Sequence, residues 1–123
     1  MRKLMWLLPV LVVAFIFASQ AESKSKPKTR AFTLLNIQYE GSKIWVPGTM
    51  IVKKGDTVKL KLINKAPSGV HGFAINAYGI KVLVPNDGKA VEVEFVAKKS
   101  GLFQTYCHQH SAHIGGQLLV LKR

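Results

Sequence analysis

The sequence alternates apolar and polar residues with a period of two from Ala31 to near the C-terminus. Segments 58–62 and 91–95 show this best, with an apolar residue at every second position and lysines or glutamates between them. Such alternation indicates antiparallel strands that bury one face. No stretch beyond the N-terminal segment has the 3.6-residue period of a helix, so we expect an all-β fold.

Turn-forming residues interrupt the alternation at short intervals, among them Pro47-Gly48, Gly55-Asp56 and the run 85–88. Strands are therefore predicted near 31–39, 43–46, 49–53, 57–64, 71–76, 79–84, 90–96, 102–107 and 117–122. Many short strands with regular turn signals indicate a single antiparallel Greek-key β-sandwich or barrel.

The N-terminus has the pattern of an export signal. Arg2 and Lys3 precede the apolar run Leu4–Ala18, and Ser19-Gln20-Ala21 supplies small residues for cleavage after Ala21. We predict a signal peptide at 1–21, a basic flexible linker at 22–30, and one domain at 31–123. The apolar run is shorter than the roughly twenty residues that span a bilayer, although an uncleaved anchor is an alternative. We expect an exported, periplasmic protein.

The only cysteine, Cys107, stands beside most of the chain's histidines. His108, His110 and His113 follow it within six residues, and His71 is the fourth histidine. A lone cysteine in an exported protein cannot form an internal disulfide, which leaves an intermolecular bridge, a free thiol or a metal ligand. Thiolate and imidazole together are preferred by soft and borderline transition metals, so a metal site is the favoured interpretation.

The predicted strands suggest how these side chains meet. Cys107 closes the strand 102–107, His110 and His113 follow in the next loop, and His71 opens a strand far upstream. Because loops cluster at the ends of a sandwich, we expect the four to lie at one pole.

Two further expectations concern the surroundings of this pole. Alternation turns His108 away from an inward Cys107, so a surface or supporting role is expected for it rather than ligation. Apolar side chains, namely Phe73, Phe95 and Phe103, are expected to back the site.

These features resemble the cupredoxins. The run from Val46 to Val58 with its Lys-Lys-Gly-Asp turn, the upstream histidine and the Cys-x2-His loop are similar to that family's pattern. The likeness covers about residues 31–123, and in the segment 72–80 and the ligand loop it is strongest to the nitrosocyanins, the red copper proteins. It implies one copper ion, and it raises a trimer as a possible oligomer. Two departures are that His71 stands where nitrosocyanins carry a glutamate ligand, and that the loop is two residues shorter.

His71, followed later by Gly79-Ile80-Lys81, is also similar to the copper domain of cytochrome oxidase subunit II. That binuclear site requires a second cysteine and a loop methionine, and neither occurs here, since Ser111 occupies the loop and the nearest methionine is Met50. What is left is a mononuclear site of one thiolate with two or three imidazoles. Copper is the expected metal, and zinc fits the same ligands.

Three functions follow as hypotheses: a periplasmic electron carrier, a copper site with an open position that acts on a small molecule such as a nitrogen oxide, and copper storage or delivery. The net charge of +12, or 12 − 2 = +10 without Arg2 and Lys3, raises the hypothesis of steering toward an acidic redox partner such as a cytochrome or oxidase. Solubility and a weak attraction to anionic surfaces explain the same charge. Nucleic-acid binding is not expected because no basic and aromatic motif is present, and membrane contact is expected only peripherally or through an uncleaved signal.

Overall fold

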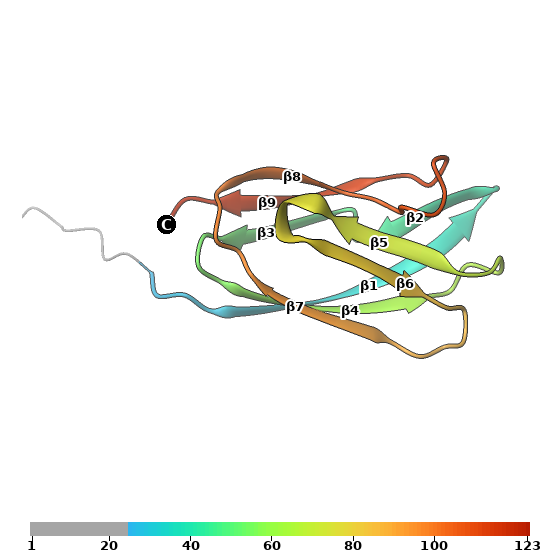
Figure 1. Ribbon diagram of the computed structural model, residues 1–123, viewed down its shortest axis with the longest axis horizontal. Coiled ribbons are helices and arrows are strands. Elements are labelled where there is room, and N and C mark those ends of the chain that lie inside the picture. Colours follow the sequence, from blue (N-terminus) through green and yellow to red (C-terminus); the bar gives the residue numbers. More distant parts are fainter. Residues whose placement is uncertain (1–24) are drawn as a thin grey trace, which may run out of the picture.

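The computed structural model describes residues 25–123, which form nine strands and one short 3-10 helix (Figure 1). In chain order the elements are β1 (Thr29–Tyr39), β2 (Ser42–Val46), β3 (Thr49–Lys53), β4 (Thr57–Asn64), β5 (His71–Ile75), η1 (Asn76–Tyr78), β6 (Ile80–Val84), β7 (Val91–Val96), β8 (Gly101–Thr105) and β9 (Gly116–Leu121). All nine predicted strands are confirmed within two residues at each end. The predicted signal peptide lies outside the described residues.

Two sheets and a hairpin make up the sandwich. One sheet has the order β2-β1-β4-β7, the other β3-β9-β8, and β5 pairs with β6. The β5–β6 hairpin continues the second sheet through a bridge in which Ala74 and Tyr106 exchange backbone hydrogen bonds of 2.8 and 3.1 Å. The all-β sandwich is thus as predicted.

The strand directions are more mixed than the alternation suggested. Four of the six strand pairs are antiparallel, whereas β1 with β4 and β3 with β9 run parallel. Alternation within one strand reports which face is buried and carries no information about the direction of its neighbour. The chain reaches the parallel arrangement by placing β2 and β3 in different sheets before β4 returns beside β1.

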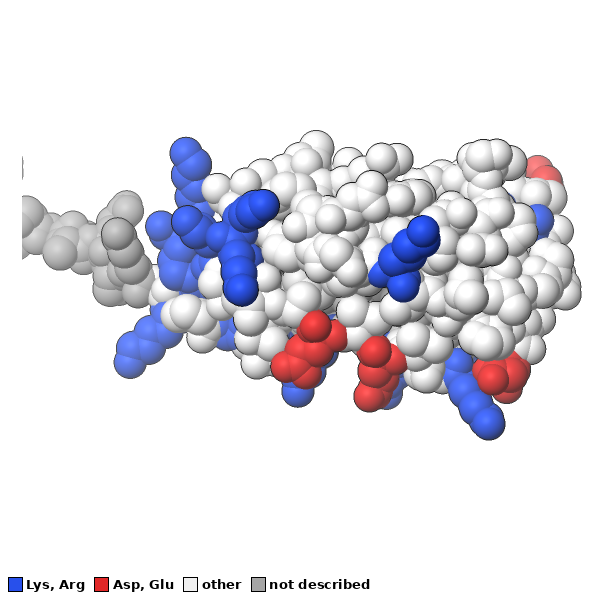
Figure 2. All heavy atoms as spheres, in the orientation of Figure 1, with Lys and Arg blue, Asp and Glu red and all other residues white. Residues whose placement is uncertain are grey.

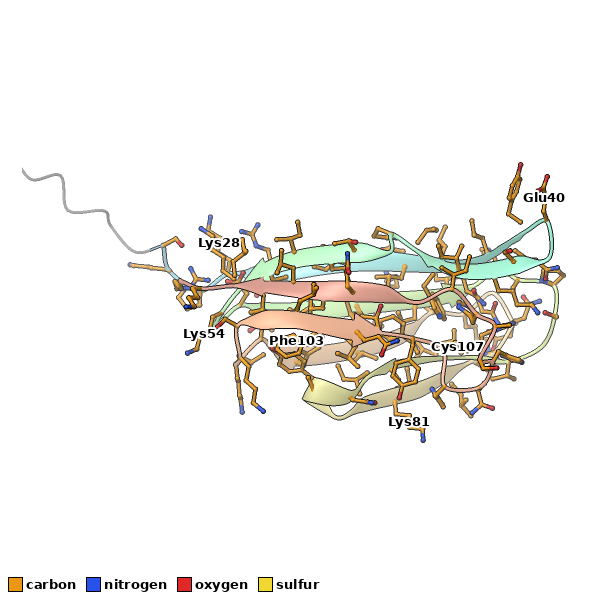
Figure 3. The ribbon with its side chains drawn as sticks, turned by 90° about the horizontal axis from the view of Figure 1, so that it is seen from above. Lys28, Glu40, Lys54, Lys81, Phe103 and Cys107 are labelled. Carbon is orange, nitrogen blue, oxygen red and sulfur yellow. The ribbon has the colours of Figure 1, made fainter. Side chains whose placement is uncertain are left out.

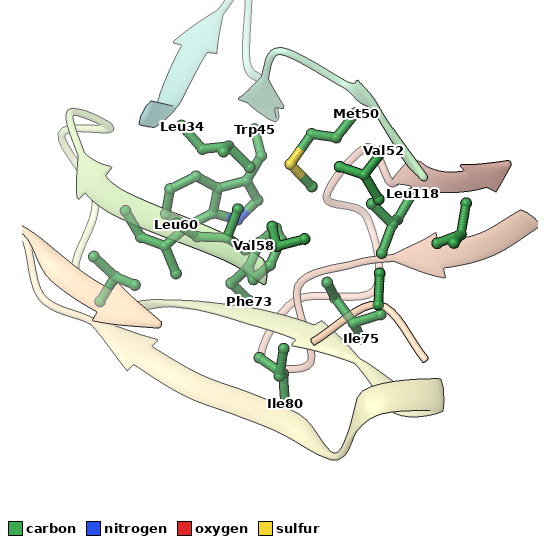
Figure 4. Packing of buried hydrophobic residues seen from close by; sticks show 14 residues of the cluster. Leu34, Trp45, Met50, Val52, Val58, Leu60, Phe73, Ile75, Ile80 and Leu118 are labelled. Carbon is green, nitrogen blue, oxygen red and sulfur yellow. The ribbon is translucent and has the colours of Figure 1, made fainter. Parts of the chain in front are cut away.

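The core lies between the two sheets and is filled by the inward residues of the alternating strands (Figure 4). β4 shows the pattern directly, since its buried positions are every second residue from Val58 to Asn64. β5 breaks it, because all five of its residues are buried. His71, the first residue of β5, is therefore enclosed by protein.

Register places the strand ends at two opposite poles. Thr29 of β1 pairs with Thr57 of β4, which pairs with Val96 of β7. Lys53 of β3 pairs with Leu121 of β9, so these ends meet at one pole. Asn64, at the other end of β4, lies at the opposite pole with the start of β5 and the end of β8 (Figure 3).

The predicted linker boundary at residue 30 falls within β1, and the described residues before β1 contact the domain. β1 begins at Thr29, and the backbone N–H of Lys28 donates to Asp56 Oδ1 at 2.9 Å. Arg123 also donates to Ser25. The buried Asp56 carboxylate needs donors, and this stretch supplies them. Within residues 25–123 the structure has no helix long and apolar enough to cross a bilayer.

Candidate metal centre

Three side chains of ligand type come together at the pole where β4 and β8 end. One ligand atom each of His71, Cys107 and His113 lies within 4.8 Å of the others, and all three residues are buried. β5 contributes the first, the chain just past β8 the second, and the loop before β9 the third. Cys107 is labelled in Figure 3 at this end of the molecule.

His110 lies at the rim of this cluster. Its Nδ1 is 3.7 Å from Cys107 Sγ, and its ring centroid is 4.5 Å from that of His71. The residue is exposed, unlike the other three. The structure therefore brings all four predicted residues together, three inside and one at the surface; that each of them is a ligand stays a prediction.

His108 takes a different place. It is half-buried and packs over Gly72, where a Cβ added to the glycine would lie 2.4 Å from His108 Nδ1. It is not one of the three clustered residues, and its contact with the backbone of β5 agrees with a supporting role.

The imidazole of His71 is oriented by its backbone neighbour. Its Nε2 lies 2.7 Å from the carbonyl oxygen of Ser68, so Nε2 carries the proton and donates it. Nδ1 then holds the lone pair, and this atom is buried with no hydrogen-bond partner among the described residues. A buried nitrogen without a partner is costly, and a metal ion bound there would remove the cost.

His113 is oriented by two buried asparagines. Asn64 Nδ2 donates to the carbonyls of Gly69 and Val84, at 2.9 and 3.0 Å, which fixes its Oδ1 as an acceptor. Asn36 Nδ2 donates to that oxygen at 3.1 Å, so Asn36 Oδ1 is left to accept from His113 Nε2 at 2.8 Å.

The consequence is that His113 Nδ1 carries a lone pair. That atom lies 3.1 Å from the carbonyl oxygen of Ile114, which is a contact between two acceptors when the ring is neutral. Hydrogen bonds from the far nitrogen of a ligand histidine fix its tautomer in metal proteins, and both buried imidazoles here show that arrangement. The donor set thus fits a metal ion.

The thiol of Cys107 receives one backbone hydrogen bond. Gly72 N–H donates to Sγ at 3.2 Å, and the Gly72 carbonyl accepts from Trp45 Nε1 at 3.0 Å. The peptide beside His71 is therefore held from both sides. The backbone N–H thus helps to fix the position of Sγ, the atom that would bind a metal as its thiolate.

Burial keeps the inner imidazoles neutral. It lowers the pKa of His71, and the charges of His110 and Lys43 add to the effect although the Ser68 contact opposes it. Burial also lowers the pKa of His113, with the same two charges and His71 adding to it and the Ile114 contact opposing it. Because the ordinary value is near 6.5, both rings are neutral at pH 7, as ligation requires.

The apolar wall behind the cluster differs in part from the prediction. Phe73 is fully buried beside Trp45, with ring centroids 5.7 Å apart in an edge-to-face contact. Phe95 and Phe103, also predicted to back the site, pack instead on Tyr78, at 4.8 and 5.4 Å. Their strand positions point inward as expected, but they lie farther from the ligand pole, and Trp45 takes the place assigned to them.

Comparison with known proteins identifies the family. A family model described as a cupredoxin-like domain matches residues 7–120. The chain belongs to the cupredoxin-like domain family. The family resemblance seen in the sequence is thereby confirmed, and the more specific likeness to nitrosocyanins stays a prediction.

Two curated relatives of this cupredoxin are nitrous-oxide reductases, from Cupriavidus necator and from Ralstonia nicotianae. Each is 42% identical to it over 67 residues, which cover 51% of this chain and 10% of the relative. This cupredoxin thus matches only about a tenth of the length of these relatives.

Solved structures share the fold. A copper nitrite reductase of Nitrosomonas europaea has a TM-score of 0.64 at 20% identity, covering 78% of this chain and 42% of that one. A copper-containing nitrite reductase of Thermus scotoductus has a TM-score of 0.62 at 23% identity, covering 78% and 28%. At these identities the likeness concerns the fold.

Sequence reasoning missed the two asparagines of this cupredoxin's site. A signal was present, because Asn36 and Asn64 occupy inward positions of β1 and β4, two residues beyond the buried Leu34 and Leu62. A polar residue at an inward position needs a buried partner. The Gly72 N–H could not have been assigned to Cys107 from sequence, since 35 residues separate them.

Proposed function

We propose that this cupredoxin binds one copper ion through His71, Cys107 and His113, with His110 able to add a third imidazole, and that it carries electrons outside the cytoplasm. The observation that carries the proposal is the buried, unpartnered Nδ1 of His71 next to a buried thiol that accepts a backbone N–H. His108 Nδ1 is also buried without a partner, but it lies against the Gly72 backbone and outside the three-residue cluster, whereas His71 belongs to that cluster.

Copper suits this donor set better than harder metals. One thiolate with imidazoles accommodates both oxidation states of copper, and copper leads the affinity order of the first-row divalent metals. When bound, copper would supply the one-electron couple, while the two sheets hold the ligands in place. Zinc fits the same residues, so metal content of protein isolated from its source would decide between the two.

The proposed point of electron entry follows from the exposure of the four side chains. His110 is the one residue of the four that reaches solvent, and the exposed apolar side chains Val70 and Ile114 adjoin His71 and His113 in sequence. An apolar rim beside an exposed imidazole allows close approach of a partner. An acidic redox partner, attracted by positive charge near the histidines such as that of Lys43, would make its closest contact here.

Electron transfer to a cytochrome, followed by stopped-flow absorbance, tests this proposal. We expect Ile114→Ser to slow the reaction by about tenfold, through a weaker contact of order 1 kcal/mol. Leu102→Ser is the matched control, because Leu102 is also exposed but lies at the opposite end of β8. Equal rates in both variants would contradict docking at this rim. A rate that does not change with salt would contradict charge steering.

A second candidate function is chemistry on a small molecule, and the exposure of His110 is the observation that favours it. If His110 stays off the metal, one coordination position faces solvent and can take an external ligand. Azide or nitrite added to the Cu(II) form should then shift the optical spectrum, and His110→Ala should strengthen the shift. No shift in either protein would remove this candidate and leave the carrier.

Copper delivery has less support. Three of the four candidate ligands are enclosed by protein, whereas transfer requires ligands that a partner can reach. Rapid loss of copper from the protein to a weak chelator would support copper delivery.

A further inference from the structure

The pole opposite the metal site carries a dense group of positive side chains. We call it the basic pole, and it consists of Lys26, Lys28, Arg30, Lys53, Lys54, Lys98, Lys99, Lys122 and Arg123. Register brings these residues together, because the start of β1 and the ends of β3, β7 and β9 meet there. Figure 2 shows the blue side chains gathered at this end, where the described chain begins.

Little acidic charge offsets the basic pole. Among residues 25–123 the one acidic side chain at this pole is that of Asp56, which is fully buried and paired with Arg30 and Arg123. Glu92 and Glu94 lie farther along β7, across from Lys61 and Lys59. The outer surface of the pole is therefore strongly positive.

The positive charge that remains free to bind a partner at the basic pole comes mainly from lysines. Both arginines contact other groups of the protein: Arg30 contacts Asp56, and Arg123 contacts Asp56, the Lys54 carbonyl and Ser25. The lysines remain, and within the described residues none of those at the pole forms an ion pair with a carboxylate. Lysine acts as a point charge without the fork geometry of arginine, so the pole suits a diffuse anionic surface better than one shaped acidic group.

Distance argues against a redox partner at this pole. β4 runs between the two poles, and eight residues of strand span roughly 25 Å. Electron tunnelling slows exponentially with distance, so a partner bound at the basic pole would exchange electrons poorly with the Cys107 site.

The described chain also begins at the basic pole, which argues for contact with a membrane there. Ser25 is fixed on the basic pole by Arg123, and only residues 19–24 separate it from the apolar sequence Leu4–Ala18. Six residues reach about 20 Å at most. Whenever that apolar sequence is in a membrane, the basic pole lies within this reach of the bilayer surface.

We propose that the basic pole binds the surface of an anionic phospholipid membrane and that the metal site then faces away from the bilayer. Clusters of lysine near a membrane are attracted by anionic headgroups. This orientation leaves the His110 rim open to a soluble partner. The proposal is independent of whether the site holds copper.

Vesicle co-sedimentation of the full chain tests it, with phosphatidylcholine vesicles containing or lacking phosphatidylglycerol. We expect binding to the anionic vesicles to exceed binding to the neutral ones and to weaken with salt. The triple variant Lys54→Glu, Lys98→Glu, Lys99→Glu should bind the anionic vesicles on the order of a hundredfold less. All three side chains are exposed, and thermal unfolding would verify that the variant is folded.

The matched control is Lys65→Glu, Lys81→Glu, Lys89→Glu, which makes the same change in net charge at exposed positions away from the basic pole. It should keep most of the anionic binding. An equal loss in both variants, or equal binding to the two kinds of vesicle, would overturn the proposal. Preferential binding of polyglutamate, with no binding to anionic vesicles, would overturn it in favour of an acidic protein partner.

Discussion

At the scale of single residues, the candidate site depends on two asparagines that are far from its histidines and cysteine in sequence. Asn64 is fixed by two carbonyls and orients Asn36, which in turn orients His113. Each hydrogen bond fixes which atom of the next side chain donates and which accepts. The tautomer of His113 is therefore determined by Asn64, through Asn36. Cys107 and the histidines indicate a metal site, and the asparagines determine which nitrogen of His113 carries the lone pair.

Replacing Asn36 tests this relay. Asn36→Leu removes the acceptor for His113 Nε2–H while keeping the side-chain size, so copper affinity should fall by about 10- to 100-fold. Stability of the metal-free protein should fall by about 1–3 kcal/mol, because buried polar atoms lose partners. Isothermal titration with copper and urea unfolding measure the two effects.

Leu34→Ala on the same strand provides the control. Leu34 is buried, so this change should cost about 2–5 kcal/mol of stability while the folded protein keeps its copper affinity. If both variants lose affinity in proportion to stability, Asn36 acts on the fold alone and the relay is wrong.

Asp56 has a distinct role at the other pole, where it determines the response to acid. Burial opposes its ionisation, but the N–H groups of Lys28 and Lys53 and the charges of Arg123 and Arg30 outweigh this and lower its pKa below 3.8. A carboxyl with a lowered folded-state pKa stabilises the protein above its unfolded pKa, and the stability is lost as pH falls through the folded value.

The stability of the protein should therefore include a contribution that is constant above about pH 5 and declines below about pH 4. Asp56→Asn should remove that contribution and lower stability at pH 7 by about 2–3 kcal/mol. Urea unfolding at several pH values measures it. Glu94→Gln, at an exposed carboxylate, should change stability by less than about 1 kcal/mol; a similar loss in the two variants would contradict the role given to Asp56.

At the scale of elements, β5 determines the shape of the site. It is buried along its whole length, its first residue is His71, and its second residue, Gly72, donates to Cys107 and accepts from Trp45. His108 covers the same glycine from the ligand loop. The position of the loop relative to β5 thus depends on the absence of a side chain at residue 72.

Gly72→Ala should force His108 aside, because the new Cβ would lie 2.4 Å from its Nδ1. We expect a loss of about 1–3 kcal/mol in stability, measured by urea unfolding. In the background of His108→Ala the same substitution should cost at least 1 kcal/mol less, since the clashing ring is gone. Additive effects of the two substitutions would show that the crowding at Gly72 comes from elsewhere.

The positions of the strands were more predictable from the sequence than their pairing. Alternation located the strand from Thr57 to Asn64 because each inward residue there is buried. It did not reveal the parallel neighbours of β4 and β9, since a strand's own pattern is the same beside either kind of partner. It also misplaced Phe95 and Phe103, whose inward direction was correct but whose height along the sandwich depends on register.

The sequence predicted which side chains would come together at the site, but not how deeply each of them is buried. The spacing of Cys107, His110 and His113 favoured a metal loop, and the structure brings His71 to it. That His110 is exposed while His113 is buried could not be read from spacing, because it depends on Asn36, 77 residues away from His113.

At the scale of the whole molecule, the sandwich separates two surfaces. One pole holds the Cys107 cluster and the exposed rim at His110, and the other holds the lysines of the basic pole, where the described chain begins (Figures 2 and 3). The parallel pairing of β1 with β4 and of β3 with β9 gathers like strand ends at each pole. As proposed, one end would bind a surface and the other would exchange electrons.

The central claim is that Cys107 is the thiolate of a mononuclear copper site, and the optical spectrum of the copper-loaded protein tests it most directly. We predict an intense thiolate-to-copper charge-transfer band in the visible region that disappears in Cys107→Ser, since sulfur is then absent. Failure to bind copper, or a spectrum unchanged by Cys107→Ser, would contradict the claim.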